Sequence, residues 1–189
     1  RAKRFIKEFG QLEMAYSKRR NLRRVRLALP HGASVKLSPG RHNALQVAVV
    51  EEFGPRFAPG AHLLYLGDTA KKHVVCEAET LASLEIGITE HDKLPDIVLH
   101  DPKQNWLFLI EAVTSHGPVN PKRHAEIEEM LSRCPAQRIY VTAFLTKSDF
   151  RKYAADIAWE TEVWLAETPD HMIHFNGPKF LGPYKRKGP

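Results

Sequence analysis

Two short β-prone runs joined by turn-forming residues constrain the fold of this 189-residue chain more than any other stretch. The runs are Ile97 to Leu99 and Trp106 to Ile110, and the segment Asp-Pro-Lys-Gln-Asn at 101–105 separates them. Apolar β-prone residues on both sides of a turn-rich segment are typical of a β-hairpin. We therefore expect a hairpin folded about Lys103 and Gln104.

This hairpin would place two acidic side chains opposite each other. Pairing about 103 and 104 sets Asp96 across from Glu111, and facing residues of antiparallel strands have Cβ atoms about 4.5–5.5 Å apart. Two carboxylates at that separation repel unless a cation lies between them. Mg²⁺ binds one or two carboxylates and keeps positions for water and phosphate oxygens, so the pair predicts a metal-dependent phosphodiesterase.

Two solvated acids at strand ends are the competing interpretation of the same residues. Glu111 lies between Ile110 and Ala112 in an apolar run. An acid inside a buried strand needs a partner, which favours the metal site.

Positive charge is concentrated at the start of the chain. The net charge is +6, and residues 1–41 contain 12 lysines and arginines but only two glutamates. The segment 18–26, Lys-Arg-Arg-Asn-Leu-Arg-Arg-Val-Arg, is long enough to contact several phosphates. A basic arm beside an acidic body indicates polyanion binding by the arm and metal chemistry in the body, with a solvated basic helix as the alternative.

Composition narrows the class of protein. Apolar residues make up 43% and charged residues 26% of the chain, as in soluble globular proteins. No apolar run approaches about 18 residues, so no transmembrane helix is expected. Cys76 and Cys134 form no Cys-X-X-Cys motif, which indicates a reducing, cytoplasmic setting and no zinc site.

The first residue of the chain is Arg1 rather than methionine, so we expect a fragment of a longer protein. A transit peptide is a less favoured interpretation of this arginine-rich, acid-poor segment.

The remaining pattern predicts an α/β fold with a mixed central β-sheet flanked by helices. We expect a helix from Ser38, as N-cap, to Gly54-Pro55, and another from Lys122 to Cys134, with Asn120 as N-cap and Pro121 in the first turn. Further helices are expected at 78–84 and 149–158. Strands are expected at 25–29, 34–37, 62–67, 72–76, 138–144, 162–165 and 172–175.

Several longer motifs are more specific than these patterns. The longest is Asn-Trp-Leu-Phe-Leu-Ile-Glu-Ala-Val-Thr-Ser-His-Gly-Pro at 105–118. The others are Leu-Ser-Pro-Gly-Arg-His-Asn (37–43), Leu-Tyr-Leu-Gly-Asp-Thr (64–69), Leu-Pro-Asp-Ile-Val (94–98), Tyr-Val-Thr-Ala-Phe (140–144), Ala-Trp-Glu-Thr-Glu-Val-Trp (158–164) and His-Phe-Asn-Gly (174–177). On these motifs the sequence resembles the BsuBI/PstI family of type II restriction endonucleases.

The resemblance implies a PD-(D/E)XK nuclease domain at 37–189. Residues 1–36, with their basic helix and hairpin, would be the tail of a missing helix-turn-helix-type DNA-binding domain. It also implies a homodimer that uses Mg²⁺ to hydrolyse double-stranded DNA at a short palindrome, which is CTGCAG for founding members of the family. A cognate DNA methyltransferase would protect the same site in the cytoplasm of the bacterial or archaeal host.

The chain departs from the family motif at the third position, where Val113 replaces a lysine. Valine can neither orient a water nor stabilise phosphorane charge, so we expect another cation there. Lys122 is our first choice and Lys72 the second, and His116 could act as general base or phosphate ligand. Each of these could equally be an ordinary surface or DNA-contact residue.

The other expected site residues follow from these roles. Glu52 and Asp68 are expected as accessory metal ligands or water-positioning groups beside Asp96 and Glu111. The residues expected to contact DNA are Arg19, Arg20, Arg23, Arg24, Lys72, Ser115, Lys122 and Arg123.

Two other functions stay open at this point. A catalytically silent DNA-binding module is favoured by Val113, and a repair or structure-selective nuclease would share the same core.

Overall fold

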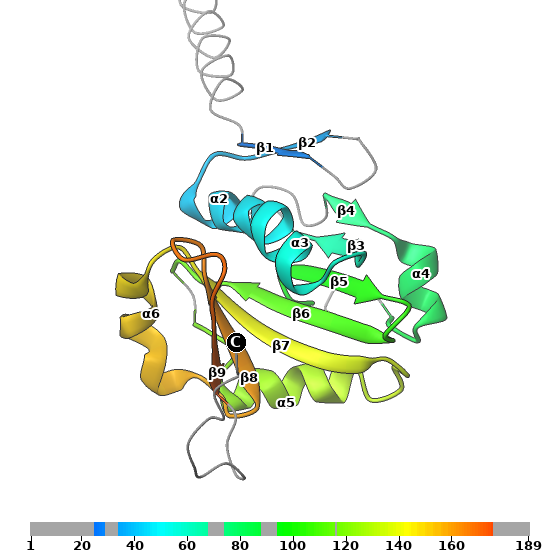
Figure 1. Cartoon of the computed structure of the whole chain (residues 1–189). Helices are drawn as coiled ribbons and strands as arrows, with labels where there is room; N and C mark the ends of the chain where they lie inside the picture. The colour runs from blue at the N-terminus through cyan, green and yellow to red at the C-terminus, as the bar shows by residue number, and fades with distance from the viewer. Residues whose placement is uncertain (1–24, 29–33, 68–73, 88–93, 116, 176–189) are drawn as a thin grey trace, which may run out of the picture.

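A seven-stranded mixed sheet with the order β4-β3-β5-β6-β7-β8-β9 forms the centre of the molecule (Figure 1). The computed structural model describes residues 25–28, 34–67, 74–87, 94–115 and 117–175. The strands of this sheet are β3 (His62–Leu66), β4 (Val75–Cys76), β5 (Ile97–Asp101), β6 (Trp106–Ala112), β7 (Gln137–Phe144), β8 (Thr161–Leu165) and β9 (Met172–Phe175). A separate two-stranded ribbon consists of β1 (Val25–Ala28) and β2 (Ser34–Leu37).

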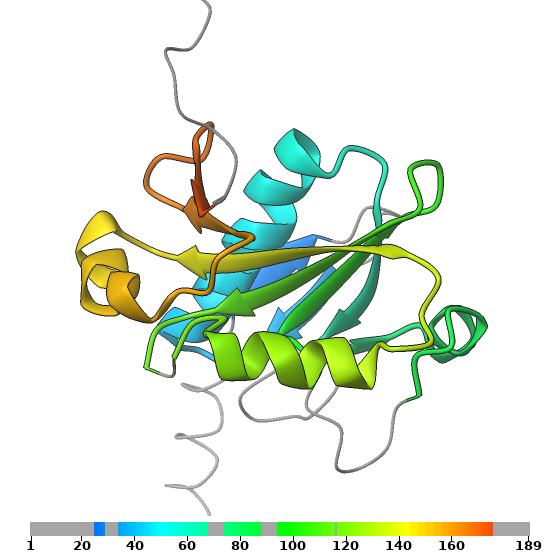
Figure 2. The same ribbon diagram turned by 90° about the horizontal axis from the view of Figure 1, so that it is seen from below.

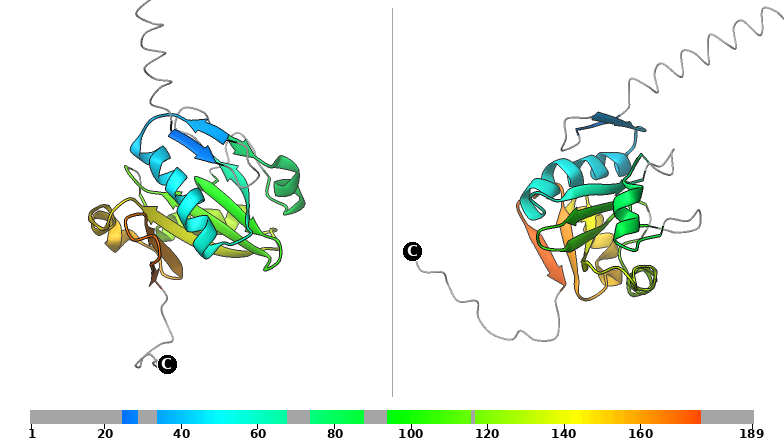
Figure 3. Two further views of the ribbon diagram at one scale, coloured as in Figure 1. Left: turned by 45° about the horizontal axis from the view of Figure 1, so that its top comes forward. Right: turned by 90° about the vertical axis from the view of Figure 1, so that its right-hand side faces the viewer.

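Helices cover both faces of the sheet, so the predicted α/β class is confirmed. They are α2 (Arg41–Ala48), the π-helix η1 (Val49–Phe53), α3 (Gly54–Phe57), α4 (Ala78–Ser83), α5 (Pro121–Met130), α6 (Lys147–Tyr153) and the 3₁₀-helix η2 (Ala154–Asp156). In Figure 2, α5 lies across one face while α2 and α3 lie behind the sheet. Figure 3 shows the same layers from the side. Among the described residues, no helix has the length and apolarity that a membrane-spanning segment needs.

The hairpin β5–β6 has the expected register. Ile97 pairs with Ile110 and Asp101 with Trp106 in an antiparallel ladder. The turn is closed by Asp101, whose Oδ1 accepts hydrogen bonds from the backbone N–H of Lys103 at 2.9 Å and of Gln104 at 3.3 Å. β6 then pairs in parallel with β7, and α5 lies on the crossover between them, as parallel pairing requires.

The first core layer lies between the sheet and the helical segment α2–η1–α3. Leu45, Val49 and Phe53 are buried there against alternate residues of β6, including Phe108. The Phe53 ring packs edge-on against Phe108, with centroids 6.2 Å apart, and against Trp164, at 5.8 Å. Alternation along the strand fixes which residues of β6 face this layer.

The second layer lies on the opposite face, under α5 and α4. Ile127 and Leu131 pack with Leu81 against Leu107 and Leu109. A third cluster lies beside α6, where Val113 and Phe144 pack with Val163 and Leu165. Val113 is only 2% exposed, and its N–H donates to the Ala143 carbonyl at 2.9 Å.

The first helix differs from the prediction at both ends. It begins at Arg41 with Gly40 as N-cap, and the carbonyl and hydroxyl of Ser38 instead accept bonds from Asn43 Nδ2, each at 2.8 Å. Gly54 and Pro55 do not end the helix, because Pro55 lies in the first turn of α3, where a missing N–H leaves no helical bond unmade. The Ser38 cap and the stop at 54–55 were therefore wrong.

The other predicted elements shift by a few residues. α5 begins as expected, with Asn120 as N-cap, but ends at Met130. α6 begins at Lys147 with Thr146 as N-cap. The strand expected at 72–76 covers only 75–76 of the described residues. The basic segment 18–24 lies outside the described residues.

We expect Phe53→Ala to lower the free energy of unfolding by about 3–5 kcal/mol, because a buried aromatic ring is lost from the centre of the first layer. Urea unfolding followed by circular dichroism measures this. Phe57→Ala is the matched control, since Phe57 is half-buried and should cost clearly less. Equal losses in the two variants would show that Phe53 is not central to the layer.

Candidate active site

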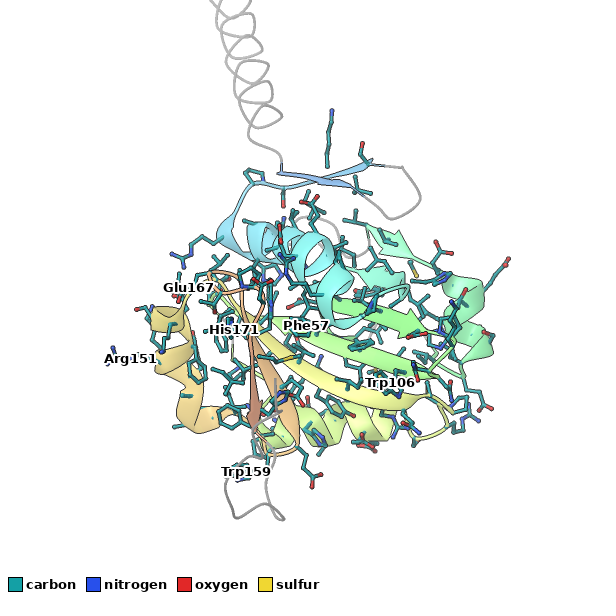
Figure 4. The ribbon with its side chains drawn as sticks, in the orientation of Figure 1. Phe57, Trp106, Arg151, Trp159, Glu167 and His171 are labelled. Atoms are coloured by element: carbon teal, nitrogen blue, oxygen red, sulfur yellow. The ribbon has the colours of Figure 1, made fainter. Side chains whose placement is uncertain are left out.

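Four polar side chains from four elements meet at one end of the sheet. Asp96 directly precedes β5, and Glu111 lies near the end of β6. His42 lies in the first turn of α2 and Arg123 in the first turn of α5. In Figure 1 the arrowhead of β6 points left, to the side on which both helices begin. Figure 4 shows Trp106 at the other end of β6.

Asp96 is held by groups on three segments. Its Oδ2 accepts a hydrogen bond from the Ala112 N–H at 2.9 Å, and its Oδ1 lies 3.5 Å from His42 Nε2. Its carbonyl oxygen accepts a bond from the Gly67 N–H at 3.0 Å. The side chain is 30% exposed, so it is anchored yet open to solvent.

Glu111 is paired with Arg123 rather than with a lysine. Its Oε1 accepts bonds from both Nε and Nη2 of Arg123, each at 2.8 Å. The backbone of Arg123 is itself fixed, because its N–H donates to the N-cap oxygen of Asn120 at 2.8 Å. Glu111 is 15% and Arg123 19% exposed, so this is a largely buried ion pair.

Burial and the neighbouring charge of Asp96 raise the pKa of Glu111 from its ordinary 4.5 to about 7, against the opposing effect of Arg123. The hydrogen bond to Asp96 is the main cause that raises the pKa of His42, with burial acting against it. Arg123 therefore compensates the negative charge of Glu111 only in part.

The donor set fits a divalent cation. Two carboxylates at one end of the β5–β6 hairpin, with the Asp96 side chain 30% exposed, are the kind of ligands that Mg²⁺ takes from proteins while keeping its other positions for water and phosphate. The described residues contain no group of three or more His, Cys, Asp or Glu side chains placed to hold a metal. The fit rests on Asp96 and Glu111 alone.

An open hollow of about 410 Å³ lies beside this pair. It is lined by Glu111, by the connection from β6 to α5, and by Lys122 and Arg123 in the first turn of α5. A ligand can therefore reach Glu111 and the guanidinium from solvent.

The structure separates some of the predicted residues from the acid pair. Lys122 is 86% exposed and lies 3.8 Å from Glu126, so the cation that reaches Glu111 is its neighbour Arg123. Glu52 instead pairs with Arg56 at 2.6 Å, and Arg56 also binds Asp170. The accessory role expected of Glu52 is therefore not supported, because η1 directs it toward the β8–β9 connection.

Most of the remaining predicted site residues lie outside the part of the chain that the structure describes. Ser115 is exposed, three residues after the end of β6. Those outside the described residues are Asp68, Lys72, His116, Arg19, Arg20, Arg23 and Arg24.

Sequence reasoning gave His42 no role and gave Arg123 only a DNA contact. Nothing in the sequence pairs His42 with Asp96, because they are 54 positions apart in the chain. A weak signal existed for Arg123: α5 has no acid in its first turn, where cations are unfavourable near the positive end of the helix dipole. A cation at such a position indicates an acidic partner elsewhere.

Known proteins resemble this chain over most of its length. Residues 25–178 match the family model of the BsuBI/PstI restriction endonuclease domain. The type II restriction enzyme BsuBI of Bacillus subtilis is 43% identical over 182 residues, covering 96% of this chain and 58% of that protein. The type II restriction enzyme AplI of Arthrospira platensis is 30% identical over 185 residues, covering 94% and 56%.

A solved structure agrees with these matches. The SdaI restriction endonuclease superposes with a TM-score of 0.82 at 42% identity, covering 92% of this chain and 55% of that one. The chain thus spans a little over half the length of each of these proteins.

We expect Val113→Lys to lower the free energy of unfolding by at least about 3 kcal/mol, because it puts an ammonium into an apolar cluster. Val113→Met is the control and should cost less than about 1.5 kcal/mol. A stable Val113→Lys variant would mean that this position opens toward the acid pair.

The raised pKa of Glu111 predicts a pH-dependent stability. Between about pH 5 and 7 the folded protein holds a proton that the unfolded chain has released, so this contribution falls as pH rises through the window. The Glu111→Gln variant lacks this pH-dependent contribution, because glutamine does not titrate. The stability of the variant relative to the parent should therefore rise by about 2 kcal/mol from pH 5 to pH 8 in urea unfolding. A difference independent of pH would contradict the raised pKa.

Proposed function

Since the chain belongs to the BsuBI/PstI restriction endonuclease domain family, we propose that it is the catalytic portion of a type II restriction enzyme that hydrolyses duplex DNA with Mg²⁺. The observation that supports this most directly is the facing pair of Asp96 and Glu111 at the sheet end. The chain covers 58% of BsuBI and 55% of SdaI, so the activity of the whole protein is part of the proposal.

Asp96 and Glu111 would hold the metal. When bound, Mg²⁺ polarises the scissile phosphate and lowers the pKa of a coordinated water. His42 keeps Asp96 in place from the α2 layer, since its ring faces Oδ1. Lys122, exposed on the rim of the hollow, is assigned to a DNA phosphate rather than to the reaction centre.

The residues outside the described part keep the roles expected from the sequence. His116 is proposed as a proton acceptor or phosphate ligand, Asp68 as an accessory ligand and Lys72 as a phosphate contact. The arginines from 19 to 24 are proposed to bind the DNA backbone, where cations release counterions and add affinity without reading sequence. Residues 1–36 are proposed as the tail of a preceding DNA-binding domain.

A homodimer that cuts a short palindrome is the proposed working form, because a twofold protein matches a twofold site. CTGCAG is the first target to test. The proposed setting is the cytoplasm of a bacterial or archaeal host whose DNA is protected by a cognate methyltransferase.

A DNA-binding module without catalysis is the second candidate. Val113 favours it, and so does the pairing of each acid with a basic side chain, Asp96 with His42 and Glu111 with Arg123. Tight binding of CTGCAG duplex without cleavage in Mg²⁺ or Mn²⁺ would select this candidate.

We expect Asp96→Asn and Glu111→Gln each to slow Mg²⁺-dependent cleavage of a CTGCAG plasmid by at least about 100-fold, because each removes a charged metal ligand. Glu52→Gln is the matched control and should cut within about twofold of the parent, since Glu52 is half exposed and paired with Arg56. Gel shifts in Ca²⁺ check that both slow variants still bind DNA. Cleavage at the parental rate by either would remove the proposed site.

A further inference from the structure

Position 113 is unavailable to a catalytic cation in this fold. Val113 is 2% exposed and packs with Phe144 and Val163 in the cluster beside α6. Its backbone N–H is bonded to the Ala143 carbonyl, which extends the β6–β7 ladder by one residue. A side chain at 113 therefore belongs to the core, and the positive charge beside Glu111 must come from another element.

Arg123 meets that need from α5. Both Nε and Nη2 lie 2.8 Å from the same oxygen, Oε1 of Glu111. We propose that Arg123 supplies the cation that the motif would carry at position 113, and that in the DNA-free protein its guanidinium competes with the divalent metal for Glu111. This inference rests on the proposed nuclease function.

The placement of Arg123 is specific rather than incidental. The N-cap bond to Asn120 fixes its backbone in the first turn of α5, where the helix dipole disfavours a cation. The pairing with Glu111 offsets this cost, and the side chain is 19% exposed. Lys122, one residue earlier in the same turn, is 86% exposed and points to Glu126.

Competition follows from the shared oxygen. Two N–H donors occupy Oε1, so a metal that takes this oxygen meets a positive charge at hydrogen-bond distance. Glu111 cannot be fully bonded to the guanidinium and to the metal at the same time. Arg123 also lines the hollow, and a guanidinium is a good donor to phosphate oxygens as well as to carboxylates. A DNA phosphate in the hollow would give it a new partner as the metal takes Glu111.

The test measures metal binding without DNA. Isothermal titration with Mn²⁺ at pH 8 compares the parent with Arg123→Ala, Arg123→Lys and, as matched control, Lys122→Ala. Removing the competing charge should tighten Mn²⁺ binding of Arg123→Ala by about tenfold, whereas Lys122→Ala should stay within about twofold. Arg123→Lys should lie between them, because an ammonium does not make the paired contact.

Plasmid cleavage in Mg²⁺ is measured with the parent and the two Arg123 variants. Arg123→Ala should cut about 100-fold more slowly despite tighter metal binding, and Arg123→Lys should regain part of the rate. Circular dichroism checks that Arg123→Ala folds. If it does not, the comparison of the parent with Arg123→Lys tests the proposal instead.

The outcomes separate the two proposals. Mn²⁺ binding that is unchanged in both Arg123 variants would overturn the competition, and parental cleavage by Arg123→Ala would overturn the catalytic charge. Tighter Mn²⁺ binding by Arg123→Ala, together with a parent that does not cut DNA, would support the competition and overturn the restriction activity.

Discussion

The repulsion between two carboxylates held side by side is the interaction on which the rest of the site depends. The core prevents Asp96 and Glu111 from moving apart, because Ile97 and Ile110 face the α2 layer while Val98 and Leu109 face the α5 layer. A slip of one residue would exchange these faces and disrupt the packing of both layers. The packing of the two layers therefore holds the acids together, and the charge that results must be compensated locally.

Each helical layer supplies one of the compensating groups. α2 brings His42 to Asp96, and α5 brings Arg123 to Glu111. The same helices bury Leu45 and Ile127 in the two core layers. The packing that stabilises the fold therefore also sets the distances in the site. The two acids lie at the end of the sheet, and each of the two helical layers places one basic side chain beside one of them.

Much of this arrangement was predictable, because it depends on local rules. Turn residues at 101–105 fixed the hairpin, and its symmetry placed Asp96 opposite Glu111. The identity of the cation was not predictable: Lys122 and Arg123 differ by about 100° around the helix axis, so the choice depends on how α5 docks. The continuation through Pro55 was missed for a different reason, since a proline is also accepted in the first turn of a helix and so does not by itself mark a stop.

Replacing a strand lysine by a helix arginine changes what the charge can do. A lysine can lose its proton when its pKa is lowered, whereas a guanidinium stays protonated at any pH at which the protein is folded. Arg123 can therefore stabilise negative charge but cannot accept a proton from water. In the proposed nuclease, where position 113 is buried, the electrostatic role and the proton-accepting role must lie on different groups. That separation follows from the burial of Val113, and in the proposed reaction it gives proton transfer to a group other than the one that faces Glu111.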